Sequence, residues 1–139
     1  MPVRSGHVEL FFGPSGQPAR PDDLQQVVIH FIDGASKSLH VAVQELDNRP
    51  IAEALIRAKQ REVKVSVVLE EDYLRDDLLA RAPFDAGGKW EPNRKILAAL
   101  LRSSIPVKID FNPGIFHQKF IVRDEEITEI AQRFGRPMA

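Results

Sequence analysis

A histidine, a lysine and an aspartate stand among mostly apolar residues in the segment FNPGIFHQKFIVRD, residues 111–124. One residue separates His117 from Lys119, and Asp124 ends the segment. In a β-strand, residues two apart project from the same face, roughly 6–7 Å apart along the chain. A lysine neutralises negative charge, and a histidine serves as a nucleophile or a proton carrier. The pair is therefore suited to hold an anionic group between its two side chains.

Asp124 does not join this pair in a straight strand. It would lie about 23 Å from His117 in a fully extended chain, with its side chain on the opposite face. We therefore expect it to have a supporting or structural role, unless a partner chain brings it near the pair. The alternative interpretation of the segment is a half-buried strand with one polar face, which is the commoner origin of an isolated His-x-Lys pair.

The segments before this pair alternate between strand and helix patterns. Strands are predicted around 8–12, 38–46, 63–70, 105–111 and 116–123, and helices around 20–35, 48–60 and 93–103. This alternation predicts an α/β fold with a mixed, mostly parallel β-sheet flanked by helices. The strand VKVSVVLE, residues 63–70, is apolar nearly throughout its second half, which is typical of a strand covered on both faces.

Length and composition indicate a single globular domain over residues 1–139, with 43% hydrophobic and 28% charged residues. The formal net charge of -1 does not indicate a polyanionic partner. The chain has no cysteine, so disulfides and thiolate chemistry are excluded. There is no signal-like apolar region and no stretch of membrane-spanning length, so we expect a cytoplasmic location.

Two other groups of polar residues carry weaker signals. Gln44 and Glu45 follow a predicted strand, at the kind of position where α/β sheets place ligand-binding groups. Glu70, Glu71 and Asp72 are consecutive, so their carboxylates point in different directions. A solvated acidic surface is therefore favoured over a metal site for these three residues.

At His117, Lys119 and Asp124 the sequence resembles the phospholipase D superfamily, whose signature is H-x-K-x-x-x-x-D. The phrase AKQREVKV, residues 58–65, is similar to the family phrase A-x-x-R-G-V-x-V, with Glu62 at the position where glycine is common. The order of strands and helices before the motif also fits. The resemblance covers about residues 7–124.

The resemblance implies hydrolysis of a phosphodiester bond without a metal or another cofactor. In the family, one histidine forms a phosphohistidine, and a second histidine from another copy of the motif protonates the leaving group and then activates water. This implies that His117 is the nucleophile or the general acid, that Lys119 holds the phosphate, and that Asp124 completes the catalytic signature. The implied substrate is a nucleic acid or a phospholipid. We favour nuclease-like or general phosphodiester hydrolysis, because no lipid-binding segment is visible.

The sequence contains a single copy of the motif. The other histidines, His7, His30 and His40, have no lysine two residues later. His30 and His40 are expected to be ordinary structural or surface residues. A working site would therefore require a homodimer, in which two copies of His117 meet across a two-fold axis, or a second half from a longer protein.

The sequence departs from the family pattern after Asp124. The family phrase Gly-Ser-x-Asn is missing, and residues 125–139 are predicted to form an atypical helical tail with Asp124 as its N-cap. We expect the chain to be the N-terminal part of a longer protein or to carry a replaced tail. The alternative function is a catalytically incomplete domain that acts as a dimerisation or binding module.

Overall fold

The computed structural model describes residues 3–13, 22–75 and 90–124. Its elements are β1 (Val3–Ser5), β2 (Val8–Leu10), α1 (Leu24–Asp33), β3 (Ser38–Val43), α2 (Arg49–Gln60), β4 (Lys64–Glu70), the 3-10 turn η1 (Glu71–Tyr73), α4 (Glu91–Arg102), β5 (Val107–Asp110) and β6 (Lys119–Arg123). Residues 125–139, which were predicted to be helical, lie outside the described part of the chain.

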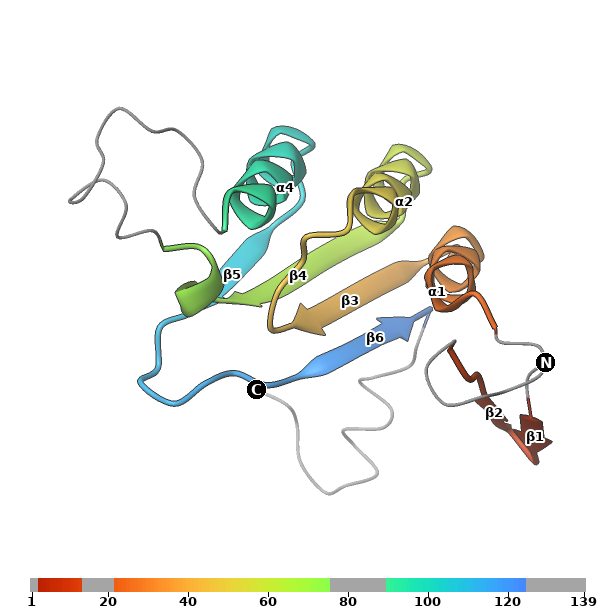
Figure 1. Ribbon diagram of the computed structural model, residues 1–139. Coiled ribbons are helices and arrows are strands. Elements are labelled where there is room, and N and C mark those ends of the chain that lie inside the picture. Colours follow the sequence, from red (N-terminus) through yellow and green to blue (C-terminus); the bar gives the residue numbers. More distant parts are fainter. Residues whose placement is uncertain (1–2, 14–21, 76–89, 125–139) are drawn as a thin grey trace, which may run out of the picture.

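Four strands form the main sheet, in the order β5-β4-β3-β6. Strands β3, β4 and β5 run parallel to one another, and β6 runs antiparallel to β3 at the edge of the sheet (Figure 1). The prediction of a mixed, mostly parallel sheet with flanking helices is confirmed. The parallel pairing follows from the crossover helices α2 and α4, each of which returns the chain to the opposite end of the sheet before the next strand.

The three helices lie on the same face of the sheet (Figure 1). Strand β4 presents its odd-numbered residues to them, so Val65, Val67 and Leu69 are fully buried. Its Ser66 and Val68, on the other face, are only half-buried. The prediction that β4 is covered on both faces therefore holds at its end, where Leu69 and Glu70 are both buried, but not at Ser66 and Val68, because no described helix covers the second face.

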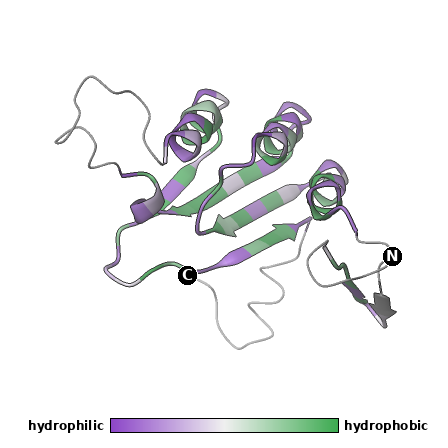
Figure 2. Cartoon of the chain, viewed as in Figure 1, coloured by the Kyte–Doolittle hydropathy of each residue, from purple (hydrophilic) through white to green (hydrophobic). Residues whose placement is uncertain are grey.

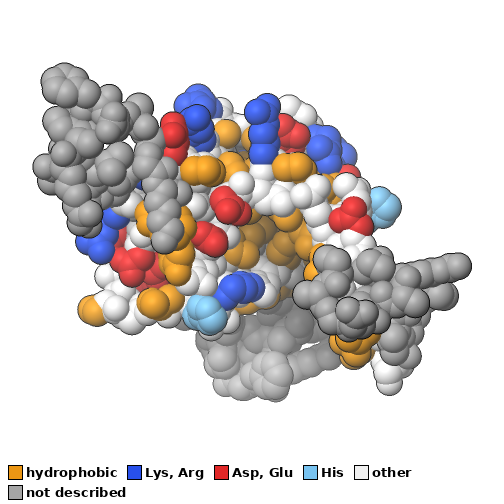
Figure 3. Space-filling model, in the orientation of Figure 1, with side chains coloured by type: hydrophobic (Ala, Val, Ile, Leu, Met, Phe, Trp, Pro, Cys, Tyr) orange, Lys and Arg blue, Asp and Glu red, His pale blue; other side chains and the backbone are white. Residues whose placement is uncertain are grey.

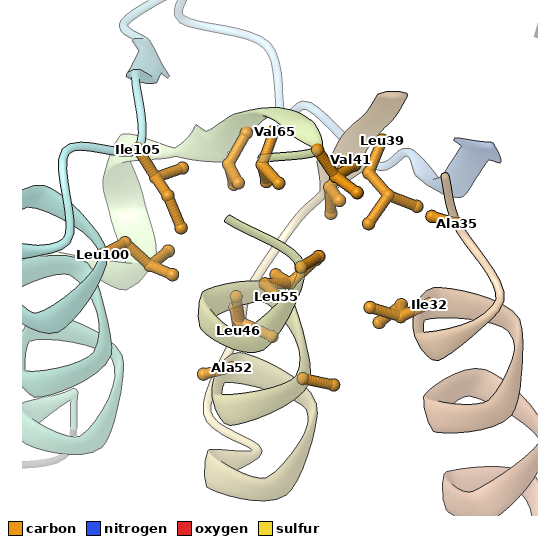
Figure 4. Packing of buried hydrophobic residues seen from close by; sticks show 14 of the residues in the cluster. Ile32, Ala35, Leu39, Val41, Leu46, Ala52, Leu55, Val65, Leu100 and Ile105 are labelled. Carbon is orange, nitrogen blue, oxygen red and sulfur yellow. The ribbon is translucent and has the colours of Figure 1, made fainter. Parts of the chain in front are cut away.

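The hydrophobic core fills the space between this sheet and the helices. Ile32 of α1, Leu55 of α2 and Leu100 of α4 point toward the sheet and are fully buried (Figure 4). Figure 2 shows hydrophobic residues in every strand of the sheet and hydrophilic residues on the outward sides of the helices. This amphipathic pattern is what sequence periodicity detects, so the helix predictions hold to within a few residues.

Side-chain caps begin the first two helices. The Asp23 carboxylate accepts a hydrogen bond from the Gln26 N–H at 3.1 Å, and the Asn48 side chain accepts one from the Ile51 N–H at 3.0 Å. Glu62, where the related phrase usually has glycine, has a φ of 69°. Left-handed backbone of this kind favours glycine, which explains the glycine in the family phrase.

The N-terminal strand differs from its prediction. A single strand was expected around residues 8–12, but β1 and β2 form a separate antiparallel pair that turns at Gly6. The side chains of β2 are exposed; Val8, for example, is 57% exposed. None of the helices in the described part of the chain has the length and apolar character needed to cross a membrane.

Candidate active site

The antiparallel direction of β6 decides where its first residue lies. Lys119 pairs with Val43, the last residue of β3. Lys119 therefore lies at the edge of the sheet where the parallel strands β3, β4 and β5 end. Ligands of open α/β sheets bind beyond the carboxyl ends of the strands, so this is the edge at which a site is expected.

His117 lies in the segment just before β6, and not within the strand as predicted. The preceding Pro113 has no N–H to donate to a ladder, and regular pairing with β3 resumes only near Gln118, whose C=O accepts from the Gln44 N–H at 2.9 Å. His117 and Lys119 nevertheless remain neighbours. The Lys119 Nζ lies 3.5 Å from the His117 C=O, and both residues are exposed. Figure 3 shows a histidine and a basic side chain next to each other on the surface.

Glu70 is a site residue that sequence reasoning missed. It was expected to be part of a solvated acidic surface, but only 1% of it is exposed. Its Oε2 accepts a hydrogen bond from the Phe116 N–H at 2.6 Å. Glu71 and Asp72 do lie nearer the surface, where they pair with Arg75 at 3.4 and 2.9 Å. The available signal was the position of Glu70 as the last residue of a buried parallel strand.

A groove of about 540 Å³ opens beside Lys119, between α1 and the strands β3 and β6. It is visible in Figure 3 as a hollow with hydrophobic atoms on its floor. Gln44 and Glu45 line it together with Lys119, so these two residues do reach the neighbourhood of the predicted site. Its apolar lining comes from Val27, Val28, Phe31, Val41, Val43, Leu46, Ile51, Phe120 and Ile121.

Asp124 lies at the opposite end of β6 from Lys119. Its carboxylate accepts hydrogen bonds from the consecutive N–H groups of Ser36, Lys37 and Ser38, and from the Ser36 hydroxyl at 3.1 Å. Its own N–H donates to the Ser38 C=O at 2.8 Å. Asp124 therefore joins the end of β6 to the loop between α1 and β3. The structure does not bring it together with His117 and Lys119.

These hydrogen bonds stabilise the ionised carboxylate of Asp124. The Lys37 N–H has the largest effect, and together with the groups of Ser36 and Ser38 it lowers the pKa of Asp124 from 3.8 to about 2. Because the pKa is lower in the folded state, the stabilisation is complete above the unfolded pKa near 3.8. It is lost as the pH falls from about 4 to about 2.

We expect Asp124→Asn to lower the stability of the protein at neutral pH and to remove part of its loss of stability between pH 4 and pH 2. Asparagine does not titrate, and its amide nitrogen cannot accept these hydrogen bonds. Urea unfolding midpoints measured from pH 2 to pH 7 check this. Asp33→Asn is the control, because Asp33 pairs with Arg57 at the surface. If the unfolding midpoint fell equally between pH 4 and pH 2 in the wild type and in Asp124→Asn, the prediction would be contradicted.

The other three histidines occupy different places in the fold. His40 of β3 projects from the face opposite Val43 and Lys119, and its Nδ1 lies 2.7 Å from the Ser66 hydroxyl. His30 is exposed on α1, and His7 is exposed in the turn between β1 and β2. These placements agree with the expectation that His30 and His40 are structural or surface residues.

The fold and the site together define a class of protein. It is an α/β domain that presents an accessible lysine at the start of its edge strand, and an accessible histidine just before that strand, at the carboxyl edge of the sheet. Comparison with known proteins gives the family. The family model described as "Cardiolipin synthase, PLD-like domain" matches residues 28–131, and the chain belongs to this family within the phospholipase D superfamily. The match begins later than the expected residue 7, and it continues past Asp124.

The chain is also similar to two known proteins of the phospholipase D type. The chain is similar to the phospholipase D of Rickettsia conorii (strain Malish 7), with 28% identity over 106 residues, which are 76% of this chain and 45% of that protein. Its structure is similar to that of Nuc, a phospholipase D family member from Salmonella typhimurium, with a TM-score of 0.52 and 28% identity. That similarity covers 72% of this chain and 57% of Nuc. The chain thus spans about half the length of each relative.

Proposed function

We propose that this chain carries half of a metal-independent phosphodiesterase site, which acts through a phosphohistidine. The observation that carries the proposal is the exposed pair of His117 and Lys119 at the carboxyl edge of the sheet, in a chain of the phospholipase D superfamily. His117 attacks phosphorus, and the ester oxygen leaves with its bonding electrons. Water then attacks the phosphohistidine, which frees His117 and releases the phosphate monoester.

Lys119 supplies the positive charge that this reaction requires. Negative charge builds up on the nonbridging oxygens of the phosphoryl group as the reaction proceeds, and a fixed ammonium group stabilises that charge. The neighbouring segment is held near the end of β3 by a backbone hydrogen bond from Gln44 to Gln118 and to β4 by the Glu70 side chain, so the pair is positioned before the substrate binds. Asp124 supports the site from a distance in this proposal, by anchoring the far end of β6.

The leaving group requires a proton donor, which the proposal assigns to a second histidine. His40 projects from the other face of the sheet, and His7 and His30 lie on other elements. We therefore propose that the second histidine is His117 of another copy, or the equivalent residue of a second half. The substrate is a phosphodiester of the nucleic-acid or general type, and a cytoplasmic location is part of the proposal.

The second candidate function is a binding or dimerisation module without activity. The observations that favour it are the single copy of the motif and the missing Gly-Ser-x-Asn phrase in this sequence. A module of this kind keeps the anion-binding pair of His117 and Lys119 but lacks the partner histidine needed for turnover.

Hydrolysis of bis(p-nitrophenyl) phosphate in excess EDTA tests the proposed activity. We expect turnover that resists EDTA and that rises more steeply than linearly with chain concentration, because two copies must meet to form one site. A short incubation followed by denaturation at alkaline pH should also trap an acid-labile phosphoprotein. Background rates at every chain concentration would instead support the inactive binding module.

A further inference from the structure

We propose that Glu70 is a positioning residue for His117. This inference rests on the proposed function, in which His117 is the nucleophile or the general acid. Glu70 ends β4, and the segment that it contacts leads directly into His117. The carboxylate acts on the backbone beside His117, and it has no role in the chemistry itself.

The contact between Glu70 and this segment is short and shielded from water. The Glu70 Oε2 accepts from the Phe116 N–H at 2.6 Å, and only 1% of Glu70 is exposed. Hydrogen bonds to an ionised acceptor are short and about twice as strong as neutral ones. Oε1 makes a longer contact with the Asp72 N–H, at 3.3 Å. A carboxylate is costly to bury unless its hydrogen bonds are made, so these contacts account for the presence of a charged group here.

A second anchor holds the other side of His117. The Gln118 C=O accepts from the Gln44 N–H at 2.9 Å, and the Gln44 C=O in turn accepts from the Glu70 N–H at 3.3 Å. The residues before and after His117 are thus both tied to the carboxyl ends of β3 and β4. His117 itself is exposed and precedes the strand, so these two anchors fix the backbone from which its imidazole projects.

Lys119 depends much less on Glu70. It belongs to β6 and pairs with Val43 of β3, so the ladder between β3 and β6 holds its backbone. Loss of the Glu70 carboxylate should therefore displace the nucleophile while it leaves the phosphate-binding charge in place. A displacement of about 1 Å costs about 10²-fold in rate when it misaligns the attacking atom. The expected signature is a lower kcat with little change in KM.

The experiment measures both the position of the segment and the rate, in Glu70→Ala, Glu70→Gln and a control. Glu71→Ala is the control, because it removes the adjacent carboxylate without touching the segment before His117. In Glu70→Ala we expect the Phe116 amide to exchange with solvent at least about tenfold faster, and kcat to fall by about 10- to 100-fold with KM within about twofold. Glu70→Gln keeps one acceptor oxygen, so we expect smaller changes in the same direction.

Each possible result of these measurements either supports or contradicts a positioning role for Glu70. Exchange of the Phe116 amide that is equal in Glu70→Ala and Glu71→Ala would overturn it, and so would an unchanged kcat or a parallel rise in KM. If Glu70→Ala does not fold, Glu70→Gln decides, and behaviour identical to wild type would overturn the proposal. Absence of turnover in the wild type would contradict a site formed by two copies of this chain, whereas the exchange of the Phe116 amide would still show whether Glu70 holds the segment.

Discussion

Replacement of His117 by asparagine should reduce EDTA-resistant hydrolysis of a phosphodiester to the background rate, a loss of at least about 10³-fold. Asparagine is close to histidine in size, but it cannot form a phosphohistidine or carry a proton. Because His117 is exposed and its imidazole makes no hydrogen bond within the described residues, the fold should not change. Initial rates of nitrophenol release, with the melting temperature as a check on folding, measure this effect.

The matched control for this variant is His30→Asn. His30 is also exposed, but it lies on α1, away from the carboxyl edge of the sheet. We expect His30→Asn to hydrolyse the phosphodiester at the same rate as the wild type. Equal background rates in the wild type and in His117→Asn would mean that the chain alone is not an enzyme. The motif would then be half of a site that other sequence completes.

Replacement of Lys119 by alanine should lower kcat/KM by about 10²- to 10³-fold, the usual cost of removing one group that stabilises the charge of a transition state. Steady-state kinetics over a range of substrate concentrations separates the loss of binding from the loss of rate. Lys119→Arg keeps the positive charge, but a guanidinium group places its donors differently, so we expect it to restore only part of the activity.

The control for Lys119 is Lys64→Ala. Lys64 is an exposed lysine at the first residue of β4, at the opposite edge of the sheet from the proposed site. Its removal changes the net charge equally but should leave kcat/KM within about twofold, because exposed charges farther apart than about 10 Å are largely screened by salt. Similar losses in both variants would indicate a general effect of charge and would contradict a specific role for Lys119.

The effects expected from the four substitutions distinguish the roles of the four residues. In the proposed site, His117 carries the chemistry, the Lys119 ammonium group stabilises negative charge on the phosphate, Glu70 positions the segment before His117, and Asp124 anchors the far end of β6. Changes at His117 and Lys119 should alter activity without changing stability. Asp124→Asn should alter stability and its dependence on pH, since the carboxylate contacts backbone amides and lies at the other edge of the sheet.

Much of the fold is encoded in local sequence patterns. The apolar stripe of the helix around 48–60 and the caps at its ends are set by residues a few positions apart, so the prediction and the helix Arg49–Gln60 nearly coincide. The pair of His117 and Lys119 was also predicted from a local pattern, because only one residue separates them in the motif. The family itself was indicated by this motif and by the phrase at residues 58–65.

The contacts that complete the site join residues far apart in the sequence, and only the tertiary structure decided them. Glu70 and Phe116 are 46 residues apart, and Asp124 and Ser36 are 88 apart. Local patterns place Glu70 in an acidic run and Asp124 at a helix start, because a carboxylate at either position is usually solvated or capping. The order of the strands brings each carboxylate against backbone N–H groups of distant residues, and local patterns do not predict these contacts. The sequence alone therefore indicated the residues that we propose to carry the chemistry, and the packing of β3, β4 and β6 decided which residues contact the segments around them.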